Sequence, residues 1–304
     1  MKIDLVLGED NFSKELANEL DVKFVKINPI TFPDSEVKPV IEDEDIIKGK
    51  NILFVLRANR LKPSINVCMV KIFLVLNSLQ RLEAKEVSLF LPWMFYSRQD
   101  RKSLPGEPIS LSDFAELYDR LNVSNIFTIN SHVYGKETRL KNYFKRTTVH
   151  DISPSKFFAI YLKTKNLKNP IVLGPGKGPA IMVKELSKSI GASYECLEKE
   201  RDHRTQEITM KPPETDIEDR DVIIYDDIAA SGGTIVRSFE LANELNPNRI
   251  FVVLSHLVTK KGVERLNNLN CSEIITTDSF NSEEPVGFTE LSLIPLISEY
   301  LKLF

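Results

Sequence analysis

The sequence predicts an α/β protein with two similar domains, each a mainly parallel sheet flanked by helices. Short β-rich runs alternate with helical stretches along the whole chain, which is typical of parallel sheets with helices on both faces. The length of 304 residues is enough for two domains of ordinary size. A strand, a loop and a helix also follow one another in the same way in each half of the chain.

The expected elements alternate from the first residues onward. The strands expected from β-rich runs are residues 3–7, 51–56, 86–91, 125–129, 170–173, 222–225, 250–254 and 273–276. The helices expected between them are residues 13–20, 64–82, 110–121, 154–162, 179–190, 234–245, 262–269 and 291–303. Ligands of such sheets bind at the carboxyl ends of the strands, so site residues are expected in the loops that follow the strands.

The composition is that of a soluble globular protein, with 42% hydrophobic and 27% charged residues. The formal net charge of −3 gives no reason to expect nucleic-acid binding, so an anionic substrate would need a local basic site. The first residues form an expected strand rather than a signal peptide, and no stretch approaches the length of a membrane span. We therefore expect a cytoplasmic protein that binds neither nucleic acid nor membrane.

The most informative segment joins an apolar strand to a helix through two acids and a loop of small residues. Asp226 and Asp227 follow the strand at 222–225, and the loop ends in Ser231-Gly232-Gly233-Thr234. The acids can accept hydrogen bonds from ribose hydroxyls, and the small loop lets backbone N–H groups and the helix N-terminus approach a phosphate. An ordinary acidic turn is the alternative, but the full order favours a sugar-phosphate site. The segment resembles the signature of phosphoribosyltransferase-type proteins.

A similar pattern without the site residues occurs in the first half. The strand at 51–56 leads through residues 57–63 into the helix from Ser64, but this loop has no acids or glycines. Two similar domains, of which only the second keeps the sugar-phosphate loop, would explain this difference. We expect residues 1–146 to form the first domain and residues 147–286 the second. The helix within residues 287–304 is expected to pack on the first domain.

Five further segments contain candidate binding groups. Residues 32–36 form a cluster that is typical of an ordinary turn. Residues 92–102 follow a strand and combine aromatic side chains with arginines, which suits either a base and its phosphates or a solvated loop. Residues 197–207 are a charged stretch, either a solvated hairpin or a mobile lid over developing phosphate charge. His132 follows a strand and is either structural or close to a metal or phosphate. The loop at 174–178 lacks the Ser or Thr that a P-loop needs after its lysine, and it stays a candidate anion loop.

Taken together, these segments resemble ribose-phosphate diphosphokinase, also called phosphoribosyl diphosphate synthase, over nearly the whole chain. The segments at 32–36, 92–101, 106–110, 197–201 and 226–234 are similar, in this order, to its FxDGE, PYxxYARQDR, GEPIS, catalytic-loop and ribose-phosphate-loop elements. The resemblance implies two phosphoribosyltransferase-type domains. It also implies that the C1 hydroxyl of ribose 5-phosphate attacks the β-phosphorus of ATP, so that AMP leaves and phosphoribosyl diphosphate forms.

By the same resemblance, each role falls on particular residues. Lys199 and Arg201 would stabilise the transition state. The ATP site would comprise Phe32, Asp34, Glu36, Arg98, Gln99, Asp100 and His132. The ribose 5-phosphate site would comprise Asp226, Asp227, Ala230, Ser231, Gly232, Gly233 and Thr234. Magnesium (Mg²⁺) would be held by His132, Asp226 and Asp227. The protein would be a homo-oligomer, a dimer or larger, in which a neighbouring subunit supplies residues 32–36 to a shared ATP site.

The chain departs from the family pattern at four positions. Gly176 and Asn130 stand where the family usually has acids near the ATP-side magnesium, and Ser35 and Ser231 replace a glycine and a threonine. Two alternatives therefore stay open. One is a catalytically weak homologue that acts as the regulatory subunit of a synthase. The other is a phosphoribosyltransferase that uses a nucleobase, which would share the loop at 226–234 but would not explain residues 32–36 or 92–101.

Overall fold

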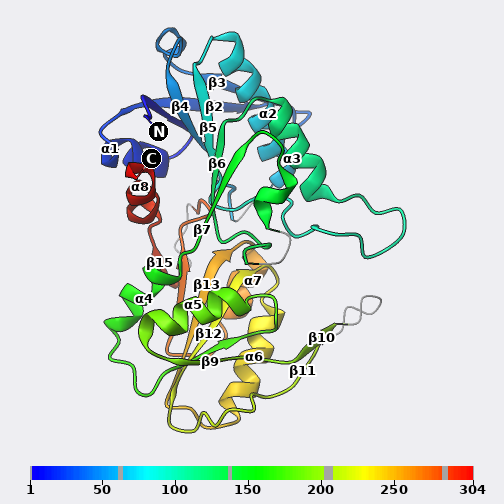
Figure 1. The fold of residues 1–304 in the computed structure, drawn as a ribbon, viewed down its shortest axis with the longest axis vertical. Helices are drawn as coiled ribbons and strands as arrows, with labels where there is room; N and C mark the ends of the chain where they lie inside the picture. Colours follow the sequence, from blue (N-terminus) through cyan, green and yellow to red (C-terminus); the bar gives the residue numbers. More distant parts are fainter. Residues whose placement is uncertain (1, 61–63, 136–138, 202–207, 283–286, 304) are drawn as a thin grey trace.

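The first of the two domains is built on a seven-stranded sheet, shown in the upper part of Figure 1. The computed structural model describes residues 2–60, 64–135, 139–201, 208–282 and 287–303. The strand order is β3-β2-β1-β4-β5-β6-β7, parallel except for the β2–β3 hairpin. The strands are β1 (Leu5–Gly8), β2 (Lys23–Thr31), β3 (Val37–Ile41), β4 (Asn51–Val55), β5 (Glu86–Phe90), β6 (Asn125–Ile129) and β7 (Thr148–Ile152). The helices are α1 (Asn11–Glu19), α2 (Ile65–Arg81) and α3 (Ser110–Arg120), with 3₁₀ turns at Glu44–Ile46 and Leu140–Tyr143.

The second domain is built on a six-stranded, fully parallel sheet of order β15-β14-β13-β12-β8-β9. Its strands are β8 (Ile171–Gly174), β9 (Ser193–Cys196), β12 (Asp221–Ala229), β13 (Arg249–Leu257), β14 (Glu273–Thr277) and β15 (Thr289–Leu291). Its helices are α4 (Ser155–Lys163), α5 (Ala180–Ile190), α6 (Gly233–Asn243) and α7 (Lys260–Leu266). A separate antiparallel ribbon, β10 (Lys199–Arg201) with β11 (Ile208–Met210), projects from this domain (Figure 1). The predicted fold class is confirmed.

Both sheets are covered by helices on both faces, and their central strands are almost wholly buried. In the first domain α2 and α3 pack on one face, and α1 packs on the other. In the second domain α6 and α7 cover one face, and α4 and α5 cover the other. Such fully buried strands read as continuous hydrophobic runs, as β12 does from Val222 to Tyr225. Within the described ranges, no helix is long and apolar enough to cross a membrane.

Seven strands were not among those expected, namely β2, β3, β7, β9, β10, β11 and β15. Of these, β2, β3, β7, β9 and β15 are partly exposed along their length. Their sequences therefore lack the continuous apolar run that marks a central strand. Because β7 pairs with β6, the first sheet extends to Ile152, beyond the expected boundary at residue 146. The second sheet likewise extends to Leu291, beyond residue 286.

The last helix, α8 (Ile294–Lys302), lies against the first domain although it follows the second along the chain (Figure 1). Ile297 and Leu301 belong to the same buried cluster as the α1 residues Phe12 and Leu16. Lys302 Nζ also lies 2.9 Å from Glu19 Oε1 at the end of α1. The helix therefore closes the face of the first sheet that α1 covers only in part.

The Ile297→Ala substitution is expected to lower the free energy of unfolding by about 2–5 kcal/mol, because it leaves a cavity beneath a fully buried side chain. Leu303→Ala is the matched control, because Leu303 is 79% exposed just beyond the helix. Equilibrium unfolding in urea measures both changes. Equal, small losses for the two variants would contradict the packing of α8 in this core.

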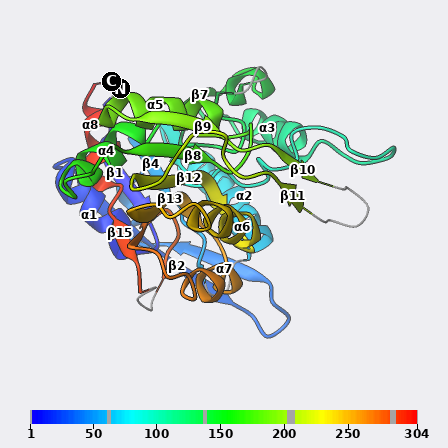
Figure 2. The ribbon, with the colours of Figure 1, turned by 90° about the horizontal axis from the view of Figure 1, so that it is seen from below.

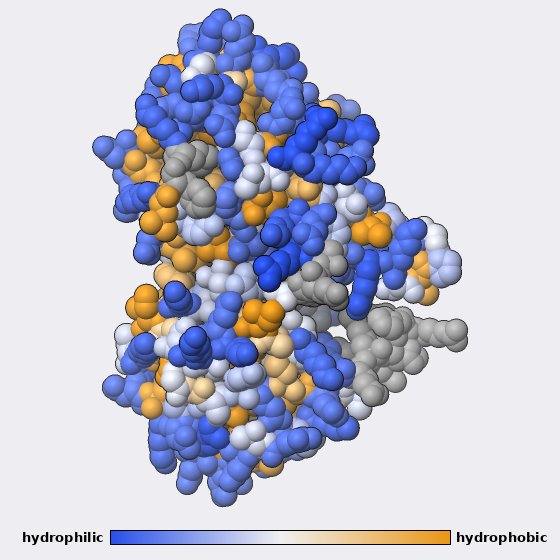
Figure 3. Space-filling view, in the orientation of Figure 1, coloured by the Kyte–Doolittle hydropathy of each residue, from blue (hydrophilic) through white to orange (hydrophobic). Residues whose placement is uncertain are grey.

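The two domains meet through the carboxyl ends of their strands. The view from below places α4, α8 and β1 on one side, and the ribbon β10–β11 on the other (Figure 2). Figure 3 shows a largely hydrophilic surface, with hydrophobic residues gathered at the left, where the domains meet. Loops that follow strands of both sheets are thus brought face to face, which is where the site residues were expected.

Candidate active site

A cleft of about 700 Å³ lies between the two domains. The first domain contributes loops after β5 and β6, and the second contributes the loop after β8, the ribbon, the end of β12 and the start of α6. The lining residues are Arg98, Arg101, Asn130, Ser131, His132, Tyr134, Pro175, Gly176, Lys177, Gly178, Pro179, Met182, Lys199, Asp226, Asp227, Ile228 and Thr234. Cations from both domains therefore face a pair of acids across one cleft.

Six predicted site residues line this cleft, namely Arg98, His132, Lys199, Asp226, Asp227 and Thr234. Four more, Ala230, Ser231, Gly232 and Gly233, directly precede Thr234 in the same loop. Gln99 is engaged elsewhere, because its amide nitrogen donates to the Pro108 carbonyl at 3.1 Å. Asp100 follows it, outside the cleft lining. The side chain of Arg201 lies outside the described residues.

The predicted residues Phe32, Asp34 and Glu36 do not line the cleft of their own chain. They form the turn of the β2–β3 hairpin, where the Phe32 backbone N–H donates to the Glu36 carbonyl at 2.8 Å. Phe32 is 41% exposed at this turn, although it is a large hydrophobic residue. The hairpin presents these side chains to the outside of the protomer.

The two adjacent acids at the end of β12 differ in their environments. Burial, followed by the charge of Asp227, raises the pKa of Asp226 well above its usual value. Burial alone would also raise the pKa of Asp227, but the hydrogen bond and charge of His132 outweigh it and lower this pKa. His132 Nδ1 lies 2.7 Å from Asp227 Oδ2. A histidine from the other domain thus lowers the affinity of Asp227 for a proton, while burial raises that of Asp226.

Lys199 reaches from the ribbon to the sugar-phosphate loop. Its Nζ donates to Thr234 Oγ1 at 3.2 Å, in the first turn of α6. Gly176, which stands where the resemblance expects an acid, has φ +151° and lies under the lysine stem. A Cβ at residue 176 would lie 3.4 Å from Lys199 Cδ, which is an ordinary van der Waals contact. The ammonium group therefore lies beside the start of α6.

The sugar-phosphate loop is held from beneath by the segment between β13 and α7. Gly232, with φ +73°, turns the chain into α6 in a conformation that favours glycine. Thr259 Oγ1 donates to the Ala230 carbonyl at 2.6 Å. A Cβ at Gly262 would lie 2.6 Å from the same carbonyl, so only glycine allows this approach. Thr259 and Gly262 were missed in the sequence because their role depends on a contact between separate segments.

Asn130, which lines the cleft, connects three strands, β6, β7 and β13. Its backbone has φ +42°, which asparagine tolerates better than most residues, and its N–H donates to the Ile152 carbonyl at 2.9 Å. Its side-chain nitrogen donates to Ser255 Oγ at 2.7 Å. The other side-chain atom, Oδ1, is buried and has no hydrogen-bond partner among the described residues.

The donor set of the cleft suits magnesium held mainly by substrate oxygens. Asp226 and Asp227 offer carboxylate oxygens, and the unpartnered Oδ1 of Asn130 offers an amide oxygen. No group of three or more His, Cys, Asp or Glu side chains that could hold a metal occurs within the described ranges. Mg²⁺ commonly takes one or two protein carboxylates together with phosphates and water, so these donors fit it. His132 contacts Asp227 instead, which favours a positioning role for the histidine.

His256, which the sequence prediction missed, is buried where the domains meet. Its Nε2 donates to the Ile129 carbonyl at 2.8 Å, and its Nδ1 accepts from Ser279 Oγ at 2.9 Å. Its ring also packs edge-on against Trp93, with 4.8 Å between the ring centroids. Burial lowers the pKa of His256 to about 4. The only signal in the sequence was a histidine at the carboxyl end of an apolar strand.

Acidification is expected to lower the free energy of unfolding, because the buried ring of His256 must take up a proton. Its folded-state pKa, about 4, lies below the ordinary value of 6.5, so the neutral ring contributes stability above pH 6.5 that is lost as the pH falls toward 4. Within this window the free energy of unfolding falls by about 1.4 kcal/mol per pH unit. Urea unfolding of the natural protein and of His256→Gln at several pH values measures this fall. The stability gap between the two should narrow by about 1 kcal/mol from pH 7 to pH 5.5, and a constant gap would contradict the assignment.

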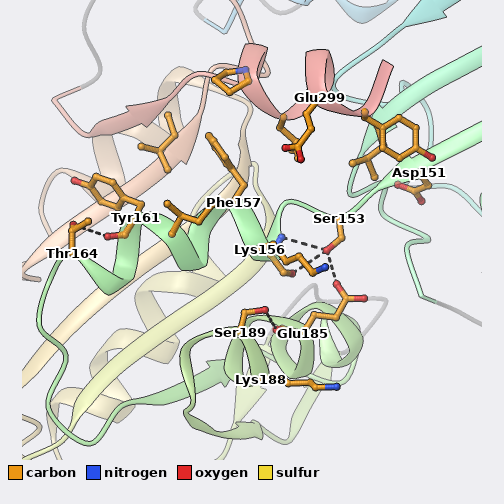
Figure 4. A pocket seen from close by; sticks show the side chains of 17 residues that line it. Asp151, Ser153, Lys156, Phe157, Tyr161, Thr164, Glu185, Lys188, Ser189 and Glu299 are labelled. Carbon is orange, nitrogen blue, oxygen red and sulfur yellow. Dashed lines mark hydrogen bonds between the residues drawn. The ribbon is translucent and has the colours of Figure 1, made fainter. Parts of the chain in front are cut away.

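A larger cavity of about 1210 Å³ lies on another side of the domain junction (Figure 4). It is bounded by α4, α5, α8 and the end of β7, and contains none of the predicted site residues. At one end, Ser153 donates a hydrogen bond to Glu185 (Figure 4). Asp151, whose pKa burial raises to about 6, accepts hydrogen bonds there from Ser131 N and Oγ at 2.9 and 2.6 Å. This cavity therefore adjoins the residue that precedes His132.

Comparison with known proteins identifies relatives of both domains. Residues 2–121 match the model for the N-terminal domain of ribose phosphate pyrophosphokinase, and residues 150–289 match the model for the phosphoribosyl transferase domain. The ribose-phosphate pyrophosphokinase of Sulfurisphaera tokodaii is 28% identical over 95% of this chain and 96% of its own length. That of Methanosarcina acetivorans is 30% identical over 72% of this chain and 73% of its own length. The crystal structure of phosphoribosylpyrophosphate synthetase from Mycobacterium smegmatis shares the fold, with a TM-score of 0.84 and 20% identity over 99% of this chain and 98% of that one.

Proposed function

This chain belongs to the ribose-phosphate pyrophosphokinase family, and on that basis we propose that it transfers the β,γ-diphosphoryl group of ATP to the C1 hydroxyl of ribose 5-phosphate. The products are phosphoribosyl diphosphate and AMP. One observation carries the proposal. A single cleft is lined by groups that lie far apart along the chain. They are cations from both domains, a pair of acids and the start of the sugar-phosphate loop.

The ribose 5-phosphate half of the site is assigned to the second domain. Asp226 and Asp227 lie within reach of the ribose hydroxyls of a sugar whose 5-phosphate occupies the loop from Ala230 to Thr234. The backbone N–H groups at the start of α6 and the positive end of the helix favour the phosphate there. His132 keeps Asp227 ionised, which preserves its capacity as an acceptor.

The ATP half is assigned to the loops of the first domain. Arg98 faces the cleft from the loop after β5 and would contact the phosphates of ATP. Because attack on the β-phosphorus passes through a charged, loosely bonded transition state, catalysis depends mainly on positioning and neutralisation. Lys199 supplies a cation at the junction of the two halves. Mg²⁺, when bound, would neutralise phosphate charge, and Asp226, Asp227 and Asn130 are the side chains that would hold it.

A second copy of the chain would complete the ATP site. Phe32, Asp34 and Glu36 lie on an exposed hairpin turn and do not reach the cleft of their own chain. A homo-oligomer in which this turn meets the cleft of a neighbour would give these residues the adenine-side role that the resemblance implies. The exposed aromatic ring of Phe32 suits contact with a flat base.

The proposed reaction is tested by AMP release from purified protein. With ATP, ribose 5-phosphate and Mg²⁺ all present, AMP and a sugar diphosphate should appear in equal amounts. Omission of any one of the three should abolish AMP release. An absence of AMP from the complete mixture would contradict the proposal and return attention to a regulatory subunit. Consumption of phosphoribosyl diphosphate with a nucleobase would instead indicate a nucleobase transferase.

A further inference from the structure

The loop after β4 occupies the same place in the first domain as the sugar-phosphate loop does in the second. Both β4 and β12 lie inside their sheets, with β4 between β1 and β5 and β12 between β8 and β13. Each strand leads through a loop into a helix, α2 or α6. The described part of the first loop, residues 57–60, has no acid and no glycine, but it contains Arg57 and Arg60. These two arginines indicate that this loop has a role other than sugar-phosphate binding.

Arg57 connects the first domain to the β14–β15 connection of the second. Its Nη2 lies 2.6 Å from Asp10 Oδ2, and its Nη1 donates to the Asp278 carbonyl at 2.5 Å. Its guanidinium also lies over the ring of Phe12, 4.3 Å from the ring centroid. Only 8% of the side chain is exposed, so these contacts replace water almost entirely.

The described side-chain hydrogen bonds of Arg60 are made with the second domain. Arg60 is fully buried, its Nε donates to the Leu257 carbonyl at 2.8 Å, and its Nη2 lies 2.6 Å from Glu290 Oε1. Its backbone N–H donates to the Asn281 carbonyl at 2.8 Å, and the Asn281 N–H donates to the Ala58 carbonyl at 2.9 Å. A buried guanidinium is tolerated only when it is paired, so Arg60 holds its partners in place as firmly as they hold it.

The contact with Leu257 leads directly to the sugar-phosphate loop. Leu257 is the last residue of β13 and lies opposite Ala229 at the end of β12. The next residue, Val258, donates its N–H to the Ala229 carbonyl at 3.1 Å. Thr259 then donates from Oγ1 to the Ala230 carbonyl at 2.6 Å. Only Val258 thus lies between Leu257, whose carbonyl Arg60 fixes, and Thr259, whose hydroxyl supports the loop.

We propose that Arg60 is a positioning residue for the sugar-phosphate loop, and that residues 57–60 after β4 are a fixed joint between the domains rather than part of a second ligand site. The joint fixes Leu257, and Leu257 sets the position of Thr259 beneath Ala230. This inference rests on the proposed function, because the loop at 230–234 must bind the 5-phosphate. It predicts that damage to the joint weakens ribose 5-phosphate binding more than ATP binding.

The test is the affinity of the full-length protein for ribose 5-phosphate, measured by calorimetry, together with the Michaelis constants for both substrates. Arg60→Met removes the contacts with Leu257 and Glu290 and should weaken ribose 5-phosphate binding by about tenfold or more, with less than about threefold change for ATP. Glu290→Gln keeps Arg60 buried and bonded to Leu257, so it should weaken binding by about threefold or less. Arg81→Met, an exposed arginine at the end of α2, is the matched control and should change neither constant.

Each outcome decides the inference. Unchanged ribose 5-phosphate affinity in Arg60→Met, or an equal loss for both substrates, overturns it and leaves the proposed function standing. If Arg60→Met does not fold, Arg60→Lys takes its place, because lysine keeps the charge but lacks the separate Nε and Nη2 donors that bond Leu257 and Glu290. It should then show an intermediate, selective loss for ribose 5-phosphate, and no such loss overturns the inference. If the natural protein itself does not bind ribose 5-phosphate, the proposed function and the inference both fail.

Discussion

Lys199→Ala is expected to lower the turnover number by about 10²- to 10³-fold, as removal of one preorganised charge from a transition state does. The ammonium group lies beside Thr234 at the start of α6, where the two halves of the cleft meet. In the proposed reaction, charge would develop there during diphosphoryl transfer, whereas other groups would hold most of the bound ground state of ATP. The Michaelis constant for ATP should therefore change by less than about threefold.

Lys211→Ala is the matched control for this variant. Lys211 directly follows β11 of the same ribbon and is exposed, and its Nζ lies 2.5 Å from Glu198 Oε2 rather than in the cleft. Its loss should leave turnover nearly unchanged. Equal losses of turnover and of ATP affinity in Lys199→Ala would show that the lysine binds the ground state and would contradict its catalytic role.

Asp226→Asn is expected to reduce kcat/KM for ribose 5-phosphate by about 10- to 100-fold, which corresponds to the loss of one hydrogen bond to a charged group. The amide keeps the shape of the protonated acid that burial favours, but it cannot ionise when cations and hydroxyls approach. The effect should fall mainly on ribose 5-phosphate, with a smaller change for ATP. Steady-state kinetics with each substrate varied in turn measures this selectivity.

Asp219→Asn controls for the general loss of one carboxylate. Asp219 lies in an exposed turn with φ +56°, a conformation that asparagine also adopts, so its replacement should be neutral. The turnover number and the Michaelis constant of Asp226→Asn could instead equal those of Asp219→Asn. In that case the proposal that the paired acids bind the ribose hydroxyls would be wrong.

The central elements of the fold were predictable because their physical signals are local. β4, β5, β6, β12 and β13 are buried on both faces and appear in the sequence as continuous apolar runs. Every expected helix has a counterpart of similar extent. The edge strands β7 and β15 escaped prediction because hydrogen bonds with one neighbouring strand, rather than an apolar sequence, define them.

The same distinction holds for the candidate site. Asp226, Asp227 and Thr234 stand in one short segment, so their proximity followed from the sequence. The contact of His132 with Asp227 joins two domains and could be suggested only by resemblance. The contacts of His256 with Ile129 and of Arg60 with Leu257 could not be suggested at all, because they depend on how the two sheets face each other.

The most direct measurement of the proposed reaction follows the β-phosphorus of ATP. The purified protein is incubated with ribose 5-phosphate, Mg²⁺ and ATP that carries radioactive phosphorus only at the β-position, with Asp226→Asn as the low-activity comparison. Attack on the β-phosphorus predicts that the label moves into the sugar product and that the released AMP is unlabelled. Label that remains in ADP would show transfer of the γ-phosphoryl group alone and would contradict the diphosphoryl transfer on which this account depends.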